Sequence, residues 1–296
     1  MKKAYALSII LWIVAGMGSI TIFLATIAKE RVNISSQIEN KLKAQLKAQE
    51  TLEIIKFYSS TGKFKFNKII NSHLEDLNIP NEIYIDGREI VINDTNISIM
   101  DSGGLYNLLF LDGDRVGKEL NKDSANIIKD SIYDWVDDDI FMKLNGAEDD
   151  YYRTISDDKY GARDKRAIQD VEELKLIKGI NENKIDRIKN DFVYARTHKN
   201  NLSVISKSRF KNIINISDIY LDEIFTHRKN DNMIEFVNQI NKLKIPNFMY
   251  LYGFYPSKVL RVNIKSKYID AIGIINSTIE VHFANKERYT YKYNEF

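Results

Sequence analysis

The first pattern along the chain is an apolar run that carries no charge over residues 4–28 and follows Lys2 and Lys3. At about 1.5 Å per residue, a helix of this length spans roughly 35–40 Å, enough to cross a bilayer core of about 30 Å. A cleaved secretory signal would have a shorter apolar core and a polar break. This run instead continues into more helical sequence without turn residues. We therefore expect a retained membrane anchor with its N-terminus in the cytoplasm.

Residues 29–58 continue the helical pattern as an amphipathic segment without Gly or Pro. Large apolar residues recur at intervals of about four and form one stripe, with charged and amide residues between them. We expect a single helix from Tyr5 to about Tyr58 whose stripe covers one face of a sheet. The alternative is an ordinary anchor followed by a stalk. The stripe consists of Ile34, Ile38, Leu42, Leu46, Leu52, Ile55 and Phe57.

Strand patterns lie on both sides of a long central region. Before it, residues 82–85, 89–92 and 96–100 are short β-prone runs, separated by a tight hairpin signal at 86–88 and by a turn at 93–95. After Pro246, apolar or aromatic residues alternate with polar ones, which is typical of half-buried strands. The alternating residues are Leu260, Val262 and Ile264, then Ile279, Val281 and Phe283, then Tyr289, Tyr291 and Tyr293.

The central region, from 105 to 243, reads mainly as short helices. The order of strands, helices and strands indicates one antiparallel sheet interrupted by an inserted helical domain, and with the N-terminal helix it predicts an α+β fold. We expect helices at 115–120, 126–135, 171–177, 183–191, 218–225 and 232–240.

Composition limits the possible functions. The 296 residues leave room for one large domain or two modest ones beyond the anchor, and the net charge of +2 provides no general attraction to nucleic acid. The chain has no Cys, which excludes disulfides and thiolate metal sites.

The densest polar feature is the segment 134–152, where seven carboxylates accompany a single base, Lys143. Carboxylates this close repel one another unless they are solvated, protonated or bridged by a cation. Oxygen ligands grouped on a loop suit Ca²⁺, although the spacing is not that of an EF-hand. A solvated acidic loop is the alternative, but the aromatic residues Trp135, Tyr151 and Tyr152 favour a packed loop, in which uncompensated charge is costly.

Several motifs resemble the K-type minor pseudopilin of the type II secretion system, general secretion pathway protein K. The closest are DWVD at 134–137, NGAEDDYY at 145–152 and VEELKLIKGI at 171–180. IMDSGGLYN at 99–107 is similar to the start of that family's helical insertion, and AYALSIILW at 4–12 is similar to its leader junction. The resemblance covers nearly the whole chain in order.

The resemblance implies a pilin-like fold with a large helical insertion, anchored in the inner membrane with its bulk in the periplasm. It also implies a place at the tip of the pseudopilus beside the I- and J-type minor pseudopilins and other type II secretion components. Members of the family bind calcium in the helical domain. The expected ligands here are Asp137, Asp139, Glu148 and Asp149, because they bracket the turn at 145–146.

The N-terminus departs from the usual pilin pattern. Prepilin peptidase usually cuts after Gly, whereas this chain offers Ala4 before Tyr5, with Ala6 as a second possibility. The methylation typical of the mature N-terminus would follow the cut. Ile9 stands where most pilin-like subunits carry Glu, a lack that K-type members share, and a subunit without that carboxylate cannot pair it with a subunit ahead.

These expectations divide the chain into six parts. They are a leader at 1–4, a transmembrane helix at 5–28, a spine helix at 29–58, the first part of the sheet at 59–104, the inserted helical domain at 105–245 and C-terminal strands at 246–296.

Three other functions were weighed. A helix-hairpin-helix nucleic-acid binder would use the Gly179 turn, but the surrounding segment 170–190 has five acids and five bases, a poor match for phosphate. An enzyme would need a catalytic motif near one of the four His residues, and the sequence has none. A minor pilin of a related type IV pilus would share the fold. The sequence therefore predicts a minor pseudopilin, which is not an enzyme and has no nucleic-acid partner.

Overall fold

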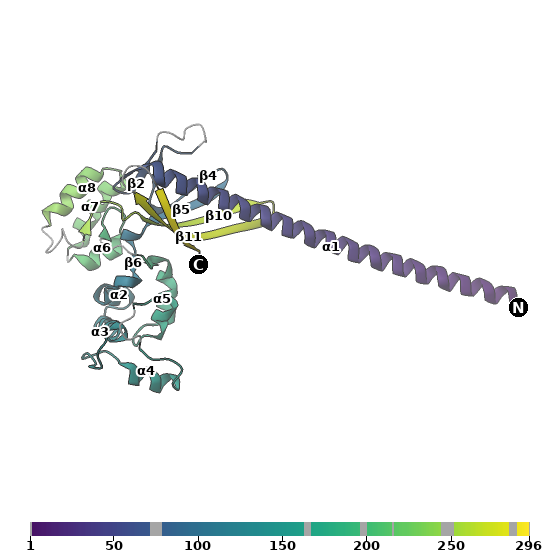
Figure 1. The fold of residues 1–296 in the computed structure, drawn as a ribbon, viewed down its shortest axis with the longest axis horizontal. Coiled ribbons are helices and arrows are strands. Elements are labelled where there is room, and N and C mark those ends of the chain that lie inside the picture. Colours follow the sequence, from purple (N-terminus) through teal and green to yellow (C-terminus); the bar gives the residue numbers. More distant parts are fainter. Residues whose placement is uncertain are drawn as a thin grey trace.

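The computed structural model describes residues 2–71, 79–162, 167–195, 200–214, 216–243, 252–283 and 289–295. Figure 1 shows a long N-terminal helix whose far half packs on a sheet, with two groups of helices attached to the sheet. The predicted α+β architecture is confirmed.

Helix α1 runs without interruption through Lys2–Thr61, or about 90 Å at 1.5 Å per residue. The single continuous helix expected from the sequence is therefore present. Its apolar first part is the one stretch, among the described residues, that is long and apolar enough to cross a membrane. This part is exposed and stands clear of the rest of the protein (Figure 1), as a single-pass anchor would.

The main sheet is antiparallel and interrupted in sequence, as predicted. Its order is β12-β11-β10-β5-β4, and the central pairing of β10 with β5 sets Ile264 opposite Ile97. This pairing brings the two ends of the helical insertion together on neighbouring strands. The bounds are Asp86–Ile92 for β4, Thr95–Asp101 for β5, Val259–Tyr268 for β10, Ala271–Phe283 for β11 and Tyr289–Glu295 for β12.

Helix α1 covers one face of β10 and β11 at very short range. A Cβ added at Gly273 would overlap the carbonyl oxygen of Ala44 and lie 2.8 Å from the backbone nitrogen of Gln45. On β10, the Ser266 hydroxyl donates a 2.5 Å hydrogen bond to the same Ala44 carbonyl. Small residues on both partners thus let the helix backbone rest on the strand backbone. Above this point the helix buries Ala48, Leu52, Ile55 and Tyr58 in the core.

The predicted role of the apolar stripe is wrong for its first half and for its last residue, Phe57, which is 52% exposed. Ile34, Ile38, Leu42 and Leu46 are 50–64% exposed. At about 100° per residue, Leu42 and Ala44 point roughly 160° apart around the helix. The sheet takes the face with small side chains because only that face permits close backbone approach, and the large apolar residues are left on the opposite side.

The hairpin expected at 86–88 is also wrong. Residues 86–88 lie inside β4, whose pairing with β5 shifts register between Asp86 and Glu89, and Gly87 adopts a φ of 86° there. This is a bulge, for which a glycine with positive φ serves as well as it does in a turn. The turn at 93–95 is correct, with φ of 48° at Asn93 and 58° at Asp94. A small second sheet, missed in part, consists of β1 Lys63–Lys65, β2 Lys68–Ile70 and β3 Glu82–Tyr84.

The insertion forms two lobes with separate cores. The first lobe, α2 to α5, packs around Ile128, Trp135 and Tyr152, and the second, α6 to α8, packs around Phe210 and Phe236. Its helices are α2 Gly113–Leu120, α3 Ala125–Val136, α4 Asp149–Ser156, α5 Glu182–Ile188, α6 Lys207–Ile213, α7 Asp218–Lys229 and α8 Met233–Lys242.

The remaining elements of the insertion are short. Residues 171–177, expected as an α-helix, contain instead the 3₁₀ helix η4 Glu172–Leu176, and α4 and α6 were not predicted. The other elements are η2 Ser102–Gly104, η3 Leu108–Phe110 and η5 Lys189–Asp191, with strands β6 Tyr106–Asn107, β7 Phe192–Val193, β8 Asn200–Asn201 and β9 Tyr252–Gly253.

The contact between α1 and the sheet leads to a first prediction. Gly273→Val should lower the free energy of unfolding by about 3 kcal/mol or more, since the new side chain meets the Ala44 backbone, which cannot move without lifting the helix. Denaturant unfolding of the detergent-extracted chain would measure the change. Ile274→Ala, at an exposed neighbouring position, is the control and should change stability by less than about 0.5 kcal/mol. Equal effects of the two substitutions would contradict this account.

Candidate metal site in the helical insertion

The acidic segment connects two helices whose facing ends each carry a carboxylate. Asp137 is the C-cap residue that follows α3, and its amide donates to the Tyr133 carbonyl at 2.9 Å. Helix α4 starts after Glu148, whose carbonyl accepts the amide of Tyr152 at 3.3 Å. The intervening loop folds back on itself between these two residues. Asp137 and Glu148 are therefore held by helix ends, which are more rigid supports than the loop.

An aromatic core fixes the two helices relative to each other. Trp135 and Tyr152 are buried and make an edge-to-face contact with ring centres 4.6 Å apart. The Trp135 indole nitrogen donates to Glu173 of η4 at 2.8 Å, and the Tyr152 hydroxyl accepts the Lys178 amide at 3.3 Å. Trp135 and Tyr152 thus pack the helix ends on either side of the loop. The expectation of a packed loop is wrong for the loop itself, because Ile140, Phe141 and Leu144 are 78–93% exposed.

Asp134 holds the loop through hydrogen bonds to its buried carboxylate. Its buried carboxylate accepts the Lys143 amide at 3.1 Å and the Lys143 ammonium at 3.3 Å. A Cβ at Gly146 would overlap this carboxylate, so the position requires glycine. Lys143 also donates to Asp137 Oδ2 at 2.8 Å. The single base of the segment, Lys143, is therefore shared between the carboxylates of Asp134 and Asp137.

Three of the four predicted ligands lie together. Asp137, Asp139 and Glu148 each offer a carboxylate oxygen, and these oxygens lie within 4.8 Å of one another. Asp137 Oδ1 and Glu148 Oε1 are buried and have no hydrogen-bond partner in the described part of the chain. Burial, and then repulsion from Asp134, Asp137 and Asp139, raises the pKa of Glu148 to about 7.

The donor chemistry of this cluster fits a hard divalent cation. Three carboxylates supply oxygen ligands of the kind that Ca²⁺ takes, and two of their oxygens lack the hydrogen bonds that buried polar atoms normally make. Without a cation, a proton on Glu148 near neutral pH relieves the repulsion only in part. A bound cation would be the partner that Asp137 Oδ1 and Glu148 Oε1 lack, and Asp139, which accepts the Phe141 amide at 2.8 Å, would add a third carboxylate.

The fourth predicted ligand lies elsewhere. Asp149 accepts a hydrogen bond from the Arg153 guanidinium and another from the Ala162 amide, at 3.0 Å. Asp149 is the first residue of α4, whereas Glu148 is its extended N-cap residue, and the cluster of Asp137, Asp139 and Glu148 does not include Asp149. The position of the four residues on both sides of the turn at 145–146 suggested a shared site, and helix α4, which begins at Asp149, was not predicted.

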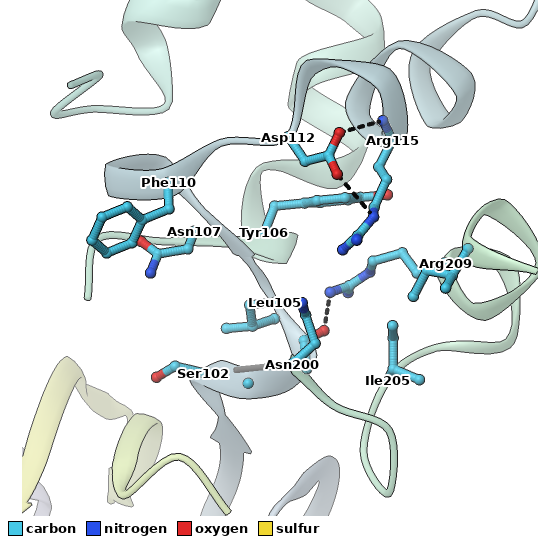
Figure 2. Close-up of a pocket in the computed structure, with 13 residues that line it drawn as sticks. Ser102, Leu105, Tyr106, Asn107, Phe110, Asp112, Arg115, Asn200, Ile205 and Arg209 are labelled. Atoms are coloured by element: carbon cyan, nitrogen blue, oxygen red, sulfur yellow. Dashed lines mark hydrogen bonds and ion pairs between the residues drawn. The ribbon is translucent and has the colours of Figure 1, made fainter. Parts of the chain in front are cut away.

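A cavity of about 70 Å³ lies where both lobes meet the end of the sheet (Figure 2). Its two guanidinium groups already have partners within the protein. Arg115 pairs with Asp112 at 3.0 Å and donates to the Tyr252 hydroxyl, and Arg209 donates to the Gly104 carbonyl and to Asp191 at 2.8 Å. We interpret this cavity as a joint that ties α2 and α6 to the sheet.

A buried carboxylate completes the joint at the point where the chain leaves the sheet. Asp101, the last residue of β5, accepts hydrogen bonds from the Gly103 amide at 2.9 Å, the Asn201 side chain at 2.7 Å and the Ser257 amide at 3.0 Å. The three donors come from the start, the middle and the end of the interruption in the sheet. The motif at 99–107 therefore holds the insertion in place and is structural.

Comparisons with known proteins agree with this architecture. Residues 116–195, which include the acidic cluster, match the family model for "Type II secretion system (T2SS), protein K". In the solved structure "The Crystal Structure of the GspK-GspI-GspJ complex from enterotoxigenic Escherichia coli Type 2 Secretion System", one chain is similar with a TM-score of 0.54 and 12% identity, over 90% of this chain and 99% of that one. No curated protein matches the sequence.

A long N-terminal helix on an antiparallel sheet, interrupted by a helical insertion, defines a pilin-like protein of the α+β class. Within that class, the family model over residues 116–195 and the fold shared over 90% of the chain agree with the resemblance to the K-type minor pseudopilins of the type II secretion system.

Proposed function

We propose that this chain caps the tip of the pseudopilus and helps start its assembly for protein export. The observation that carries the proposal is the position of the insertion. In Figure 1, α6 to α8 lie beyond the C-terminal end of α1, and α2 to α5 project to the side of the sheet. A subunit stacked further along the direction of α1 would meet these helices. The outermost position is the one that needs no such neighbour.

The identity of residue 9 supports the same position. Ile9 replaces the acidic residue that would pair with a subunit ahead within the membrane, so this chain lacks the contact that a subunit in the middle of the filament makes. A minor pilin of a related type IV pilus is the alternative with the same fold. The nucleic-acid alternative is weaker, because Gly179 turns directly against α3, where a Cβ would lie 2.9 Å from Ile127. This hairpin serves as a packing unit, and we propose a structural, non-enzymatic role for the chain.

We further propose that the chain is held in the inner membrane by α1, with the sheet and the insertion in the periplasm. Before assembly, prepilin peptidase would cut between Ala4 and Tyr5, and the new N-terminus would be methylated. The support is sequence alone: two lysines, then a small residue, then a long apolar helix.

Intact mass measurement of the membrane-extracted protein tests the processing. The expected mass is that of a chain starting at Tyr5 with one added methyl group. A cut after Ala6 would move the site by two residues and contradict the assignment to Ala4, as would retention of Met1 or loss of the whole helix.

We also propose that Asp137, Asp139 and Glu148 hold a Ca²⁺ ion, which joins the end of α3 to the start of α4 and stabilises the first lobe. Two of these side chains have buried oxygens without partners in the described chain, and these oxygens are what the ion would satisfy. Asp149 is left out of the site because Arg153 and Ala162 already use its carboxylate.

Thermal unfolding of the full chain in detergent, with EDTA or with excess calcium, tests this site. Calcium at a hundred times Kd stabilises a protein that binds it only when folded by about 2.7 kcal/mol, so the midpoint should rise. Asp137→Asn or Glu148→Gln should abolish the rise, whereas Asp149→Asn, a matched control one residue away, should retain it. A rise that survives Glu148→Gln, or that Asp149→Asn removes, would count against the three-carboxylate site.

The partners we propose are the I- and J-type minor pseudopilins, since the similar solved chain is part of a GspK-GspI-GspJ complex. The exposed stripe Ile34, Ile38, Leu42 and Leu46 runs along α1, with Leu42 and Leu46 on the side opposite the sheet contact at Ala44, and has no cover in the structure's described residues. A contiguous apolar stripe on an otherwise polar helix is a surface suited to neighbouring spine helices.

Co-extraction of the full chain with both partners, followed by measurement of stoichiometry, tests the tip position. One copy in a heterotrimer is expected. Leu42→Asp with Leu46→Asp should weaken the complex at least tenfold, about 1.4 kcal/mol, without lowering the unfolding midpoint, because both residues are exposed. The control Gln37→Asp changes an exposed position about 140° around the helix from Leu42 and should have little effect. Self-polymerisation of the chain, or labelling of this subunit along the whole filament in place of one end, would overturn the proposal.

A further inference from the structure

A groove of about 520 Å³ lies between the sheet and the first lobe of the insertion, away from the acidic loop. Its floor contains two neighbouring cross-strand pairs of β10 and β11, Arg261 with Thr278 and Asn263 with Asn276. These four side chains are on the face opposite α1, because the residues that alternate with them are buried beneath the helix. Its walls come from residues 169–171, which precede η4, and from η5 and β7. The volume lies within the roughly 300–1,000 Å³ typical of ligand pockets.

Arg261 is the unusual member of this groove. Its guanidinium donates one hydrogen bond, from Nη1 to the Phe192 carbonyl at 3.2 Å, while its Nε is buried and has no partner among the described residues. No carboxylate in the described part of the chain forms an ion pair with it. A guanidinium carries five N–H donors, and leaving buried donors unsatisfied is costly. Burial also lowers the pKa of Arg261.

The charged groups around Arg261 indicate what kind of ligand would pair with its guanidinium. Lys189 on the wall is exposed and adds a second positive charge, and Asp170 on the wall provides one negative charge. The carboxylate of Asp191, which lies behind Arg261, accepts a hydrogen bond from Arg209 at 2.8 Å. Two cations and one carboxylate line the groove, so one further negative charge would neutralise the net positive charge of its lining. This balance favours a carboxylate over a phosphate dianion.

We propose that this groove binds the acidic side chain of a segment from another protein, with the carboxylate on Arg261. A carboxylate matches the paired donors of a guanidinium better than any other monoanion found in proteins. The amide and hydroxyl groups of the floor suit a peptide backbone, and Val171 and Tyr194 offer apolar contact to a neighbouring side chain. The site is independent of the proposed calcium ion and of the tip position.

The test uses the full chain in detergent micelles and follows the Arg261 Nε–H and Tyr194 ring resonances by NMR. The probe is N-acetyl-glutamate N-methylamide, which carries an acidic side chain between two peptide groups. Its neutral counterpart is N-acetyl-glutamine N-methylamide, and acetate and inorganic phosphate are the other ligands. A saturable shift is expected with the glutamate probe and none with the glutamine probe at the same concentration.

Variants separate binding from folding. Arg261→Lys should remove the response at Tyr194. Lys189→Gln, at an exposed position that does not threaten folding, should weaken binding about two- to fivefold. Lys265→Gln, exposed on the same strand and outside the groove, should leave binding unchanged. An equal response to the glutamine probe, absence of saturation, no effect of Lys189→Gln, or acetate or phosphate binding as tightly as the glutamate probe would each overturn the proposal.

Discussion

The close approach of α1 to the strand backbone at Gly273 is the contact on which the rest of the molecule depends. Only small residues permit this approach. The Ser266 hydroxyl also donates a hydrogen bond to the Ala44 carbonyl at the point of contact. With the helix placed here, Leu52 and Tyr58 fall over the core of the sheet. The order and register of the strands then bring Asp101 and Ser257 together, and the hydrogen bonds between them hold the insertion. A shift of the helix would therefore be felt in both lobes.

Much of this fold could be predicted from the sequence because its signals are local. Leu260, Val262 and Ile264 alternate with polar residues, and all three are buried. A continuous helix followed from the absence of Gly and Pro between residues 29 and 58. The face of that helix that meets the sheet could not be found in the same way. Large apolar residues dominate any periodicity, whereas the decisive property was the smallness of Ala44 and Ala48.

The two candidate binding sites differ in how visible they are in the sequence. Asp137, Asp139 and Glu148 stand close together in the chain, and their like charge is evident from composition. The helix start that turns Asp149 away could be resolved only in three dimensions. Arg261 and Lys189 lie far apart in sequence and come together through strand register and the return of the insertion, which no local pattern encodes. Crowded like charges can be recognised in a sequence, but an isolated buried charge requires the structure.

The unbroken length of α1 also has a mechanical meaning. Between residue 29, where the apolar stretch ends, and Ala44, where the sheet begins to grip the helix, the chain passes through about four turns without Gly or Pro. This part of the helix contains no residue at which it would readily bend under load. Axial displacement or torque at the membrane end is therefore passed along the helix to the Ala44–Gly273 contact and from there to the central strands that carry the insertion. The stiffness of α1, together with the close contact between Ala44 and Gly273, determines how closely the sheet and the insertion follow a movement of the membrane end.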